Sequence, residues 1–171
     1  MTEIEVKFKT DGFDDIKKKL KEAGFRQEWD SLETVAIYDM PGNELNGKGI
    51  TVRIKDIGGK TVFTVKQKIE GKFKSAIEKE CVVDSSLADF QEMLEIIGFT
   101  RVLEYSKNRT HYSRGEYSVE LDHIEEIGEK FIELEATSEE KLDKLIAELG
   151  LRGLEPDTRS YTKIIREHRG K

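Results

Sequence analysis

Three short stretches of this chain each carry two glutamates that are separated by one residue. Side chains of a β-strand alternate between the two faces of its sheet, so residues at this spacing point to the same side. If the stretches are strands, each presents two carboxylates on one face. Paired carboxylates are suitable ligands for hard divalent cations such as Mg²⁺ or Mn²⁺. The pairs are Glu3 and Glu5, Glu78 and Glu80, and Glu133 and Glu135.

Basic residues repeat this spacing in three other strand-like stretches. Arginine and lysine bind phosphate oxygens through charge-assisted hydrogen bonds. A sheet face that carries both kinds of charge therefore indicates a site for a divalent metal and a polyphosphate. Asp122, in VELDH, faces away from its apolar neighbours Val119 and Leu121. The basic pairs are Arg53 and Lys55, Lys66 and Lys68, and Lys107 and Arg109.

The spacing of apolar residues divides the chain into strands and helices that would position these charges. Tight turns at Gly58-Gly59 and Arg114-Gly115 join consecutive strands as hairpins, which favours a mainly antiparallel sheet. Three of the helices end at a glycine, the usual left-handed cap. The predicted strands are 2–9, 33–39, 50–56, 60–68, 75–83, 101–112, 116–122 and 130–137, and the predicted helices are 14–23, 86–97, 138–149 and 160–168.

These elements predict an α+β fold. For any single strand, a charged face that is simply exposed to water is the simplest interpretation. The whole set favours another arrangement. If helices cover the apolar side, the strands can close into a barrel that has no exposed edge and holds the charges inside. Like charges there are unfavourable unless a ligand and a metal compensate them. We therefore expect an eight-stranded, mainly antiparallel closed barrel with helices packed outside.

Length and composition predict a single domain that spans residues 1–171. The formal net charge of −6 argues against a nucleic acid as partner, because nucleic-acid binding requires a basic surface. No apolar run is long enough to cross a membrane, and a lone cysteine forms no internal disulfide, so we expect a cytoplasmic protein without a membrane partner. Charged residues, mainly Lys and Glu, make up 37% of the chain, which favours a thermophilic source.

Other residues fit structural roles. Cys81 lies in a predicted strand without a histidine pattern nearby, so we expect a buried thiol rather than a nucleophile. We expect Trp29 and Phe25 in the core rather than on a nucleic-acid stacking surface. The chain has no G-x-x-x-x-G-K-[ST] loop, so its phosphate site is not of the P-loop kind.

The ordered set of charged residues resembles the CYTH superfamily, which joins class IV (CyaB-like) adenylyl cyclases with thiamine and inorganic triphosphatases. The ordered set covers nearly the whole chain and is more specific than its opening E-x-E-x-K alone. The matching positions are Glu3, Glu5 and Lys7, Arg53 in TVRIK, Lys66 in FTVKQK, Lys107 and Arg109, Asp122 in LDHIEEIG, Glu133 and Glu135, and Arg159-Ser160-Tyr161.

The resemblance implies a triphosphate tunnel, an eight-stranded antiparallel barrel whose acidic cluster binds a divalent metal. The role of Glu78 and Glu80 stays open, because their alignment shifts by a residue or two. The implied ligands of Mg²⁺ or Mn²⁺ are Glu3, Glu5, Glu133 and Glu135, with Asp122 as a further ligand or as a residue that orients the ligands. The implied catalytic and triphosphate-binding residues are Lys7, Arg53, Lys66, Lys107 and Arg109, and Lys55, Lys68 and Arg159 complete the substrate-binding set.

Within the superfamily, Arg159-Ser160-Tyr161 and the L-D-H-x-x-x-x-G spacing resemble the class IV cyclases, although the His-Phe pair that many of them carry before E-x-E-x-K is absent. We therefore expect an adenylyl cyclase that converts ATP to cyclic AMP and pyrophosphate. One alternative is an inorganic or thiamine triphosphatase. Another is a non-catalytic module that binds polyphosphate or nucleotide. Family analogy also suggests a homodimer.

Overall fold

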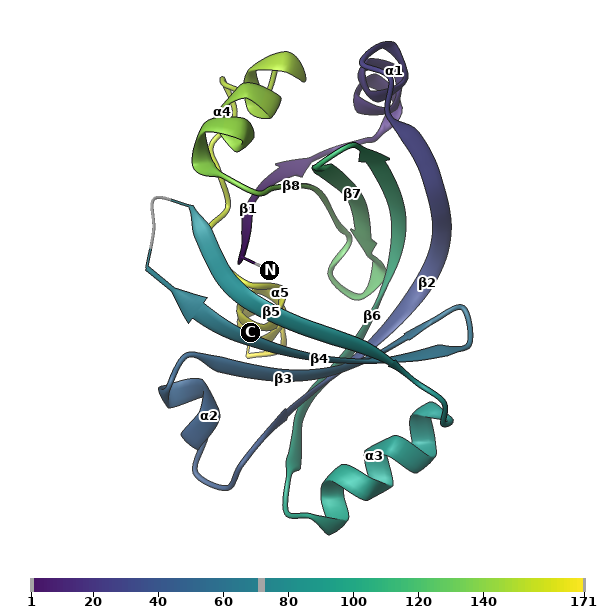
Figure 1. Ribbon diagram of the computed structural model, residues 1–171, viewed down its shortest axis with the longest axis vertical. Helices are drawn as coiled ribbons and strands as arrows, with labels where there is room; N and C mark the ends of the chain where they lie inside the picture. The colour runs from purple at the N-terminus through teal and green to yellow at the C-terminus, as the bar shows by residue number, and fades with distance from the viewer. Residues whose placement is uncertain (1, 71–72, 171) are drawn as a thin grey trace.

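A computed structural model describes residues 2–70 and 73–170, without the side chains of Thr2, Glu3 and Lys74. Eight strands close into one barrel in the order β1-β5-β4-β3-β2-β6-β7-β8, and every neighbouring pair is antiparallel (Figure 1). The closed antiparallel barrel expected from the sequence is confirmed. None of the helices described is long and apolar enough to span a membrane.

The elements follow the predicted order with three differences. Strand β2 begins at Arg26 rather than at residue 33, and neither the short helix α2 nor the 3-10 helix η1 was predicted. The first residues of β2 are mostly exposed, so they lack the apolar alternation by which a strand is recognised. The strands are β1 (Thr2–Thr10), β2 (Arg26–Asp39), β3 (Ile50–Ile57), β4 (Lys60–Ile69), β5 (Lys74–Val83), β6 (Thr100–Arg114), β7 (Tyr117–Ile124) and β8 (Glu129–Ala136), and the helices are α1 (Asp14–Glu22), α2 (Glu44–Gly47), α3 (Leu87–Ile96), the 3-10 helix η1 (Glu125–Ile127), α4 (Glu139–Glu148) and α5 (Tyr161–Arg169).

Apolar side chains on the outward faces of the strands pack under the helices. Val6 and Phe8 of β1 share one core with Leu20 of α1 and Leu145 of α4. Strands β2 and β3 form a second core with Leu94 of α3. Burial of these side chains at about 25 cal/mol per Å² stabilises the outside of the barrel. The charged faces of the same strands therefore turn inward.

Helix α5 fills part of the barrel interior. The hydroxyl of Ser160 accepts a hydrogen bond from the backbone N–H of Lys163 and caps the start of this helix. Ile164 and Ile165 of α5 then pack on inward-facing apolar residues such as Tyr105 and Phe131. In Figure 1 the yellow helix is seen through the barrel, behind β5. The charged residues thus occupy the part of the interior that α5 leaves open.

The prediction for Cys81 was wrong, because this residue is exposed. Residues 79–82 of β5 are all exposed, so the outer side of this strand end is not covered by a helix. Phe25, in contrast, lies in the core as expected.

Candidate active site

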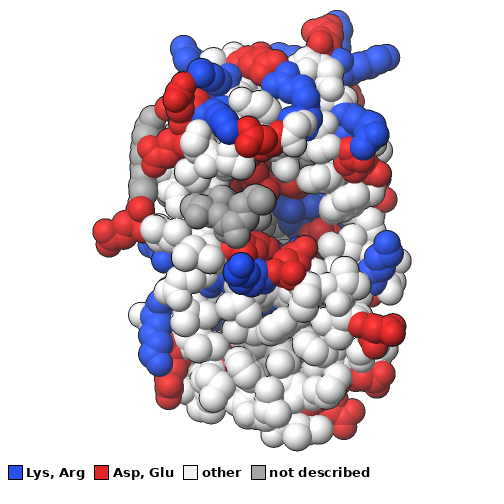
Figure 2. All heavy atoms as spheres, in the orientation of Figure 1, with Lys and Arg blue, Asp and Glu red and all other residues white. Residues whose placement is uncertain are grey.

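A cavity of about 1080 Å³ occupies the interior of the barrel, at the upper end of the range usual for ligand sites. Figure 2 shows a hollow in which acidic and basic side chains gather. Each of the eight strands contributes at least one charged residue to the lining. These residues are Glu5 of β1, Glu33 of β2, Arg53 and Lys55 of β3, Lys66 and Lys68 of β4, Glu78 and Glu80 of β5, Lys107 and Arg109 of β6, Glu120 of β7, and Glu133 and Glu135 of β8.

Three carboxylates from β1 and β8 form a cluster that we call the acidic triad: Glu5, Glu133 and Glu135. Glu5 lies directly opposite Glu135 in the register of the two strands. One carboxylate oxygen of each residue lies within 4.8 Å of the other two. A buried, all-oxygen anionic donor set of this kind fits a hard divalent ion such as Mg²⁺ or Mn²⁺. The side chain of Glu3, the fourth predicted ligand, lies outside the described residues.

Asp122 is the centre of a buried network of ion pairs. Arg109 donates from Nε to Asp122 Oδ1 at 2.6 Å and from Nη2 to Oδ2 at 2.5 Å. Lys107 Nζ donates to the same carboxylate at 3.1 Å, and the Tyr161 hydroxyl donates to it at 2.6 Å. Asp122 is 0% exposed. Because three donors occupy its oxygens, the arrangement favours a role in holding the cations over direct contact with a metal.

Glu33 is a second carboxylate partner of these cations, and sequence analysis missed it. Its Oε2 lies 3.3 Å from Lys107 Nζ and 3.9 Å from Arg109 Nε. Burial raises the pKa of Glu33, but Lys107 and Arg109 outweigh burial and lower the pKa to about 2. Glu33 is therefore anionic at neutral pH and keeps both cations in place.

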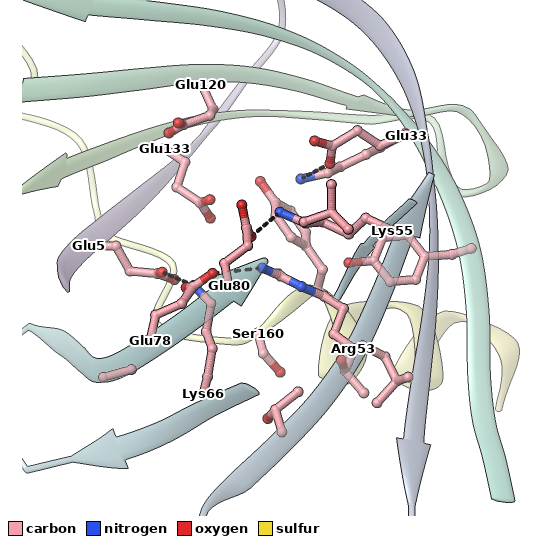
Figure 3. A pocket seen from close by; sticks show the side chains of 18 of the residues that line it. Glu5, Glu33, Arg53, Lys55, Lys66, Glu78, Glu80, Glu120, Glu133 and Ser160 are labelled. Atoms are coloured by element: carbon pink, nitrogen blue, oxygen red, sulfur yellow. Dashed lines mark hydrogen bonds and ion pairs between the residues drawn. The ribbon is translucent and has the colours of Figure 1, made fainter. Parts of the chain in front are cut away.

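The pair Glu78 and Glu80, whose role stayed open, holds the cations of β3 and β4 (Figure 3). Glu78 pairs with Lys66, and its Oε1 lies 3.3 Å from Arg53 Nη2. Glu80 Oε2 accepts hydrogen bonds from Lys55 Nζ at 2.7 Å and from a threonine hydroxyl at 3.0 Å. Each of these predicted phosphate ligands is thus oriented by a carboxylate on β5.

Three predicted substrate ligands lie at the margin of the cavity or away from it. Lys7 is buried, and its Nζ donates to the carbonyl oxygen of Arg159 at 2.5 Å and lies 4.5 Å from the centroid of the Tyr161 ring. The guanidinium of Arg159 bonds to Asp157 and Glu167 instead of entering the cavity. Lys68 is exposed where it lines the cavity.

Glu120 is an unpredicted carboxylate beside the acidic triad. It lies opposite Glu133 in the strand register, and Figure 3 shows both side chains on the same side of the cavity. Its Oε1 lies 2.9 Å from His111 Nδ1, whereas no described residue bonds to Oε2. Burial raises the pKa of Glu120 to about 8, assisted by Glu133 and Asp122 and opposed by Arg109. Its spacing from Asp122 repeats the E-x-E pattern, a signal that could have revealed it.

Replacing Glu120 with glutamine should reduce the pH dependence of stability. The folded protein keeps the proton on Glu120 up to about pH 8, whereas an unshifted carboxyl loses its proton near pH 4.5. The unfolding free energy of the wild type therefore falls as pH rises between these values. We expect metal-free wild type to lose about 3–4 kcal/mol more than the variant between pH 5 and pH 8, measured by urea unfolding.

The matched control for this measurement is Glu140→Gln, because Glu140 is an exposed carboxylate of α4. That variant should follow the wild-type pH profile. Identical profiles for Glu120→Gln and wild type would show that Glu120 ionises normally in the folded protein.

Trp29 also departs from expectation, because it is half-buried and lines the cavity instead of the apolar core. A β-bulge between Gln27 and Trp29 shifts the register of β2 against β6. Residues 29–33 pair with β6 in regular register, so Trp29 shares the inward face of Glu33. The sequence assigned Trp29 no face because the predicted strand began only at residue 33.

Comparisons with known proteins identify the family of this chain. A family model described as the CYTH domain matches residues 1–161. The chain is 30% identical over 146 residues to the adenylate cyclase CyaB of Aeromonas hydrophila, an alignment that covers 79% of this chain and 73% of the relative.

Solved structures share the fold. The PH1819 protein of Pyrococcus horikoshii is 28% identical, with a TM-score of 0.78 over 97% of this chain and 99% of that protein. HpAC1 of Hippeastrum, whose structural description reports a dominant triphosphatase activity, is 19% identical, with a TM-score of 0.67 over 98% of this chain and 95% of that one.

Proposed function

We propose, from the premise that this chain belongs to the CYTH family, that this enzyme is a metal-dependent adenylyl cyclase that converts ATP to cyclic AMP and pyrophosphate. The observation that carries the proposal is the acidic triad, which faces a set of arginine and lysine side chains across one cavity. A site for phosphate alone would not need three clustered carboxylates. A site for metal alone would not need the cations.

The triphosphate-binding groups that we propose are the cations that line the cavity. Arg53 and Lys66 lie on one side, where Glu78 orients both. Arg109 lies beside the triad, with its Nη2 3.0 Å from Glu133 Oε1. Fixed cations in a site with little water stabilise charge that develops on phosphate oxygens without having to reorient during the reaction. Lys55 of β3 and Lys107 of β6 add further positive charge to the lining of the cavity.

The acidic triad would hold Mg²⁺ or Mn²⁺, in keeping with the general divalent-metal dependence of CYTH enzymes. When bound, such an ion neutralises negative charge on the phosphate oxygens as a Lewis acid. Glu5 and Glu133 are buried, which limits competition from water for these ligands. Arg109 and Lys66 lie close enough to the triad to contact the same phosphate chain.

Cyclase and triphosphatase differ in the nucleophile. In the cyclase the ribose 3′ oxygen bonds to the α-phosphorus, the bond from that phosphorus to the β-phosphate oxygen breaks, and the hydroxyl proton leaves. In the triphosphatase, water attacks the terminal phosphorus. Similarity to CyaB and the Arg159-Ser160-Tyr161 sequence favour the cyclase. The activity of HpAC1, a protein of the same fold, keeps the triphosphatase as the second candidate.

The products formed from ATP should separate these activities. We expect cyclic AMP and pyrophosphate in equal amounts, with Mg²⁺ or Mn²⁺ supplied separately and products resolved by chromatography. Glu5→Gln protein is the control for contaminating activity. Orthophosphate from tripolyphosphate or thiamine triphosphate, without cyclic nucleotide from ATP, would replace the cyclase with a triphosphatase. Tight triphosphate binding without any product would indicate a non-catalytic module.

A further inference from the structure

Two stacked aromatic rings line the cavity at a place that the triphosphate site does not use. Trp29 of β2 and His111 of β6 lie opposite each other in the strand register. Their ring centroids are 5.3 Å apart, and their planes differ by 14°. Both residues are half-buried and both line the cavity. Each ring uses one face in this stack, and because both residues line the cavity, the pair presents aromatic surface to a ligand there.

The bulge in β2 places Trp29 in the cavity. Gln27 lies two residues earlier, and its Oε1 accepts a hydrogen bond from the hydroxyl of Tyr112, a residue of the outer core. In a regular strand, residues 27 and 29 would share that outward face. The bulge between them turns Trp29 inward. Bulges are frequent next to active sites, where they aim a side chain.

The stacked pair lies next to Arg109, one of the proposed phosphate-binding cations, two residues further along β6. His111 follows Arg109 by two residues on the same face of β6, which is about 6–7 Å along the strand. Burial lowers the pKa of His111, and Arg109 lowers it further, against the opposite effect of nearby glutamates, which disfavours a charged imidazole. Neither ring therefore offers a cation to a phosphate. Their chemistry fits the uncharged, flat part of a substrate whose phosphates lie on Arg109.

His111 is held in the stack by Glu120, whose Oε1 lies 2.9 Å from Nδ1. A ring fixed by a hydrogen bond at its edge loses less freedom when another ring stacks on it. Trp29 is the only tryptophan of the chain, and it supplies a large apolar face.

We propose that Trp29 and His111 form a platform on which the nucleobase of a nucleoside triphosphate stacks. This inference rests on the proposed triphosphate site and adds a reason for the enzyme to prefer nucleotides over inorganic polyphosphate. Stacking of a base on an aromatic side chain changes affinity by roughly 5- to 100-fold. The platform should therefore affect nucleotide binding and leave tripolyphosphate binding almost unchanged.

The fluorescence of Trp29 provides a direct test, because no other tryptophan contributes to the signal. We expect 3′-deoxy-ATP, which lacks the hydroxyl needed for cyclisation, to change the emission of the wild type in the presence of Mg²⁺. Tripolyphosphate should bind, as measured by calorimetry, with little change in emission. Equal changes with the two ligands would overturn the platform.

Variants give a second readout that does not depend on fluorescence. Trp29→Leu and His111→Leu should each weaken 3′-deoxy-ATP binding roughly 5- to 100-fold in calorimetry, while tripolyphosphate affinity stays within twofold. Trp29→Phe should retain most of the affinity. The matched control is Phe99→Leu, which removes an aromatic ring from the core under α3, outside the cavity.

The outcomes separate the two proposals. Suppose that wild type binds tripolyphosphate. If Trp29→Leu then weakens the binding of 3′-deoxy-ATP and tripolyphosphate equally, or weakens neither, the platform is wrong and the triphosphate site stands. If wild type binds neither ligand, the proposed function is wrong and the platform falls with it.

Discussion

Replacing Glu5 with glutamine should lower turnover by roughly 10²- to 10³-fold without lowering the stability of the metal-free protein. Glutamine keeps the shape of the side chain and removes one of three negative charges that lie within 4.8 Å of each other. It weakens metal binding and also relieves repulsion in the absence of metal. Lys66 Nζ, which lies 3.8 Å from Glu5 Oε2, keeps its closer partner Glu78 in this variant.

Two measurements check this expectation. Initial rates are compared at saturating Mg²⁺ and Mn²⁺, and melting temperatures are compared in a chelator. Glu22→Gln, which changes an exposed glutamate of α1, should match the wild type in both. Wild-type turnover of Glu5→Gln at saturating metal would remove the basis for the metal site. A large fall in its melting temperature would mean that Glu5 supports the fold instead.

Asp122→Asn should destabilise the protein by about 3–5 kcal/mol, the usual result of removing one member of a buried ion-pair network. The carboxylate is completely buried and accepts hydrogen bonds from Lys107, Arg109 and Tyr161. Asparagine removes the closest counter-charge of two buried cations and leaves them Glu33 and Glu133. Urea unfolding in the absence of metal measures the difference.

The control is Glu104→Gln, which breaks an exposed ion pair with Arg101 of similar length, 2.6 Å. That change should cost no more than about 1 kcal/mol. If Asp122 acts mainly as a metal ligand, its replacement would change stability only when metal is present. Unaltered stability of Asp122→Asn without metal would therefore contradict the role assigned to it.

Alternation along the strands predicted several of the charged side chains that enter the barrel. The inward positions of Arg53, Lys66 and Arg109 follow from a period of two residues once the strands are recognised. The partners of these cations could not be predicted in the same way, because they depend on strand order. Glu33 meets Lys107 only because β2 pairs with β6 in the closed barrel.

Each residue that the sequence analysis missed or misplaced can be explained by its local surroundings. Glu33 shares its face of β2 with Val35 and Ile37, so the sequence pattern indicates an apolar face there and not a charged one. Trp29 lies before residue 33, where the predicted strand began, so the alternation of that strand was not extended to it. Arg159 belongs to a recognisable motif, but the carboxylates Asp157 and Glu167 that bind its side chain come from its own segment of chain. A motif predicts that a residue is present, whereas its orientation depends on neighbours of this kind.

The position of β1 in the barrel sets the order in which the protein can assemble. β1 is the first strand made, but it lies between β5 and β8 and cannot complete its pairing until β8 exists. Among the described residues, β1 forms four register pairs with β5 and seven with β8. Contacts between such distant segments form late in folding, because the long loop between them must first close. Since Glu5 comes from β1 and Glu133 and Glu135 from β8, partly folded chains lack the acidic triad, and the late pairing of β1 with β8 assembles the site that we propose for the metal.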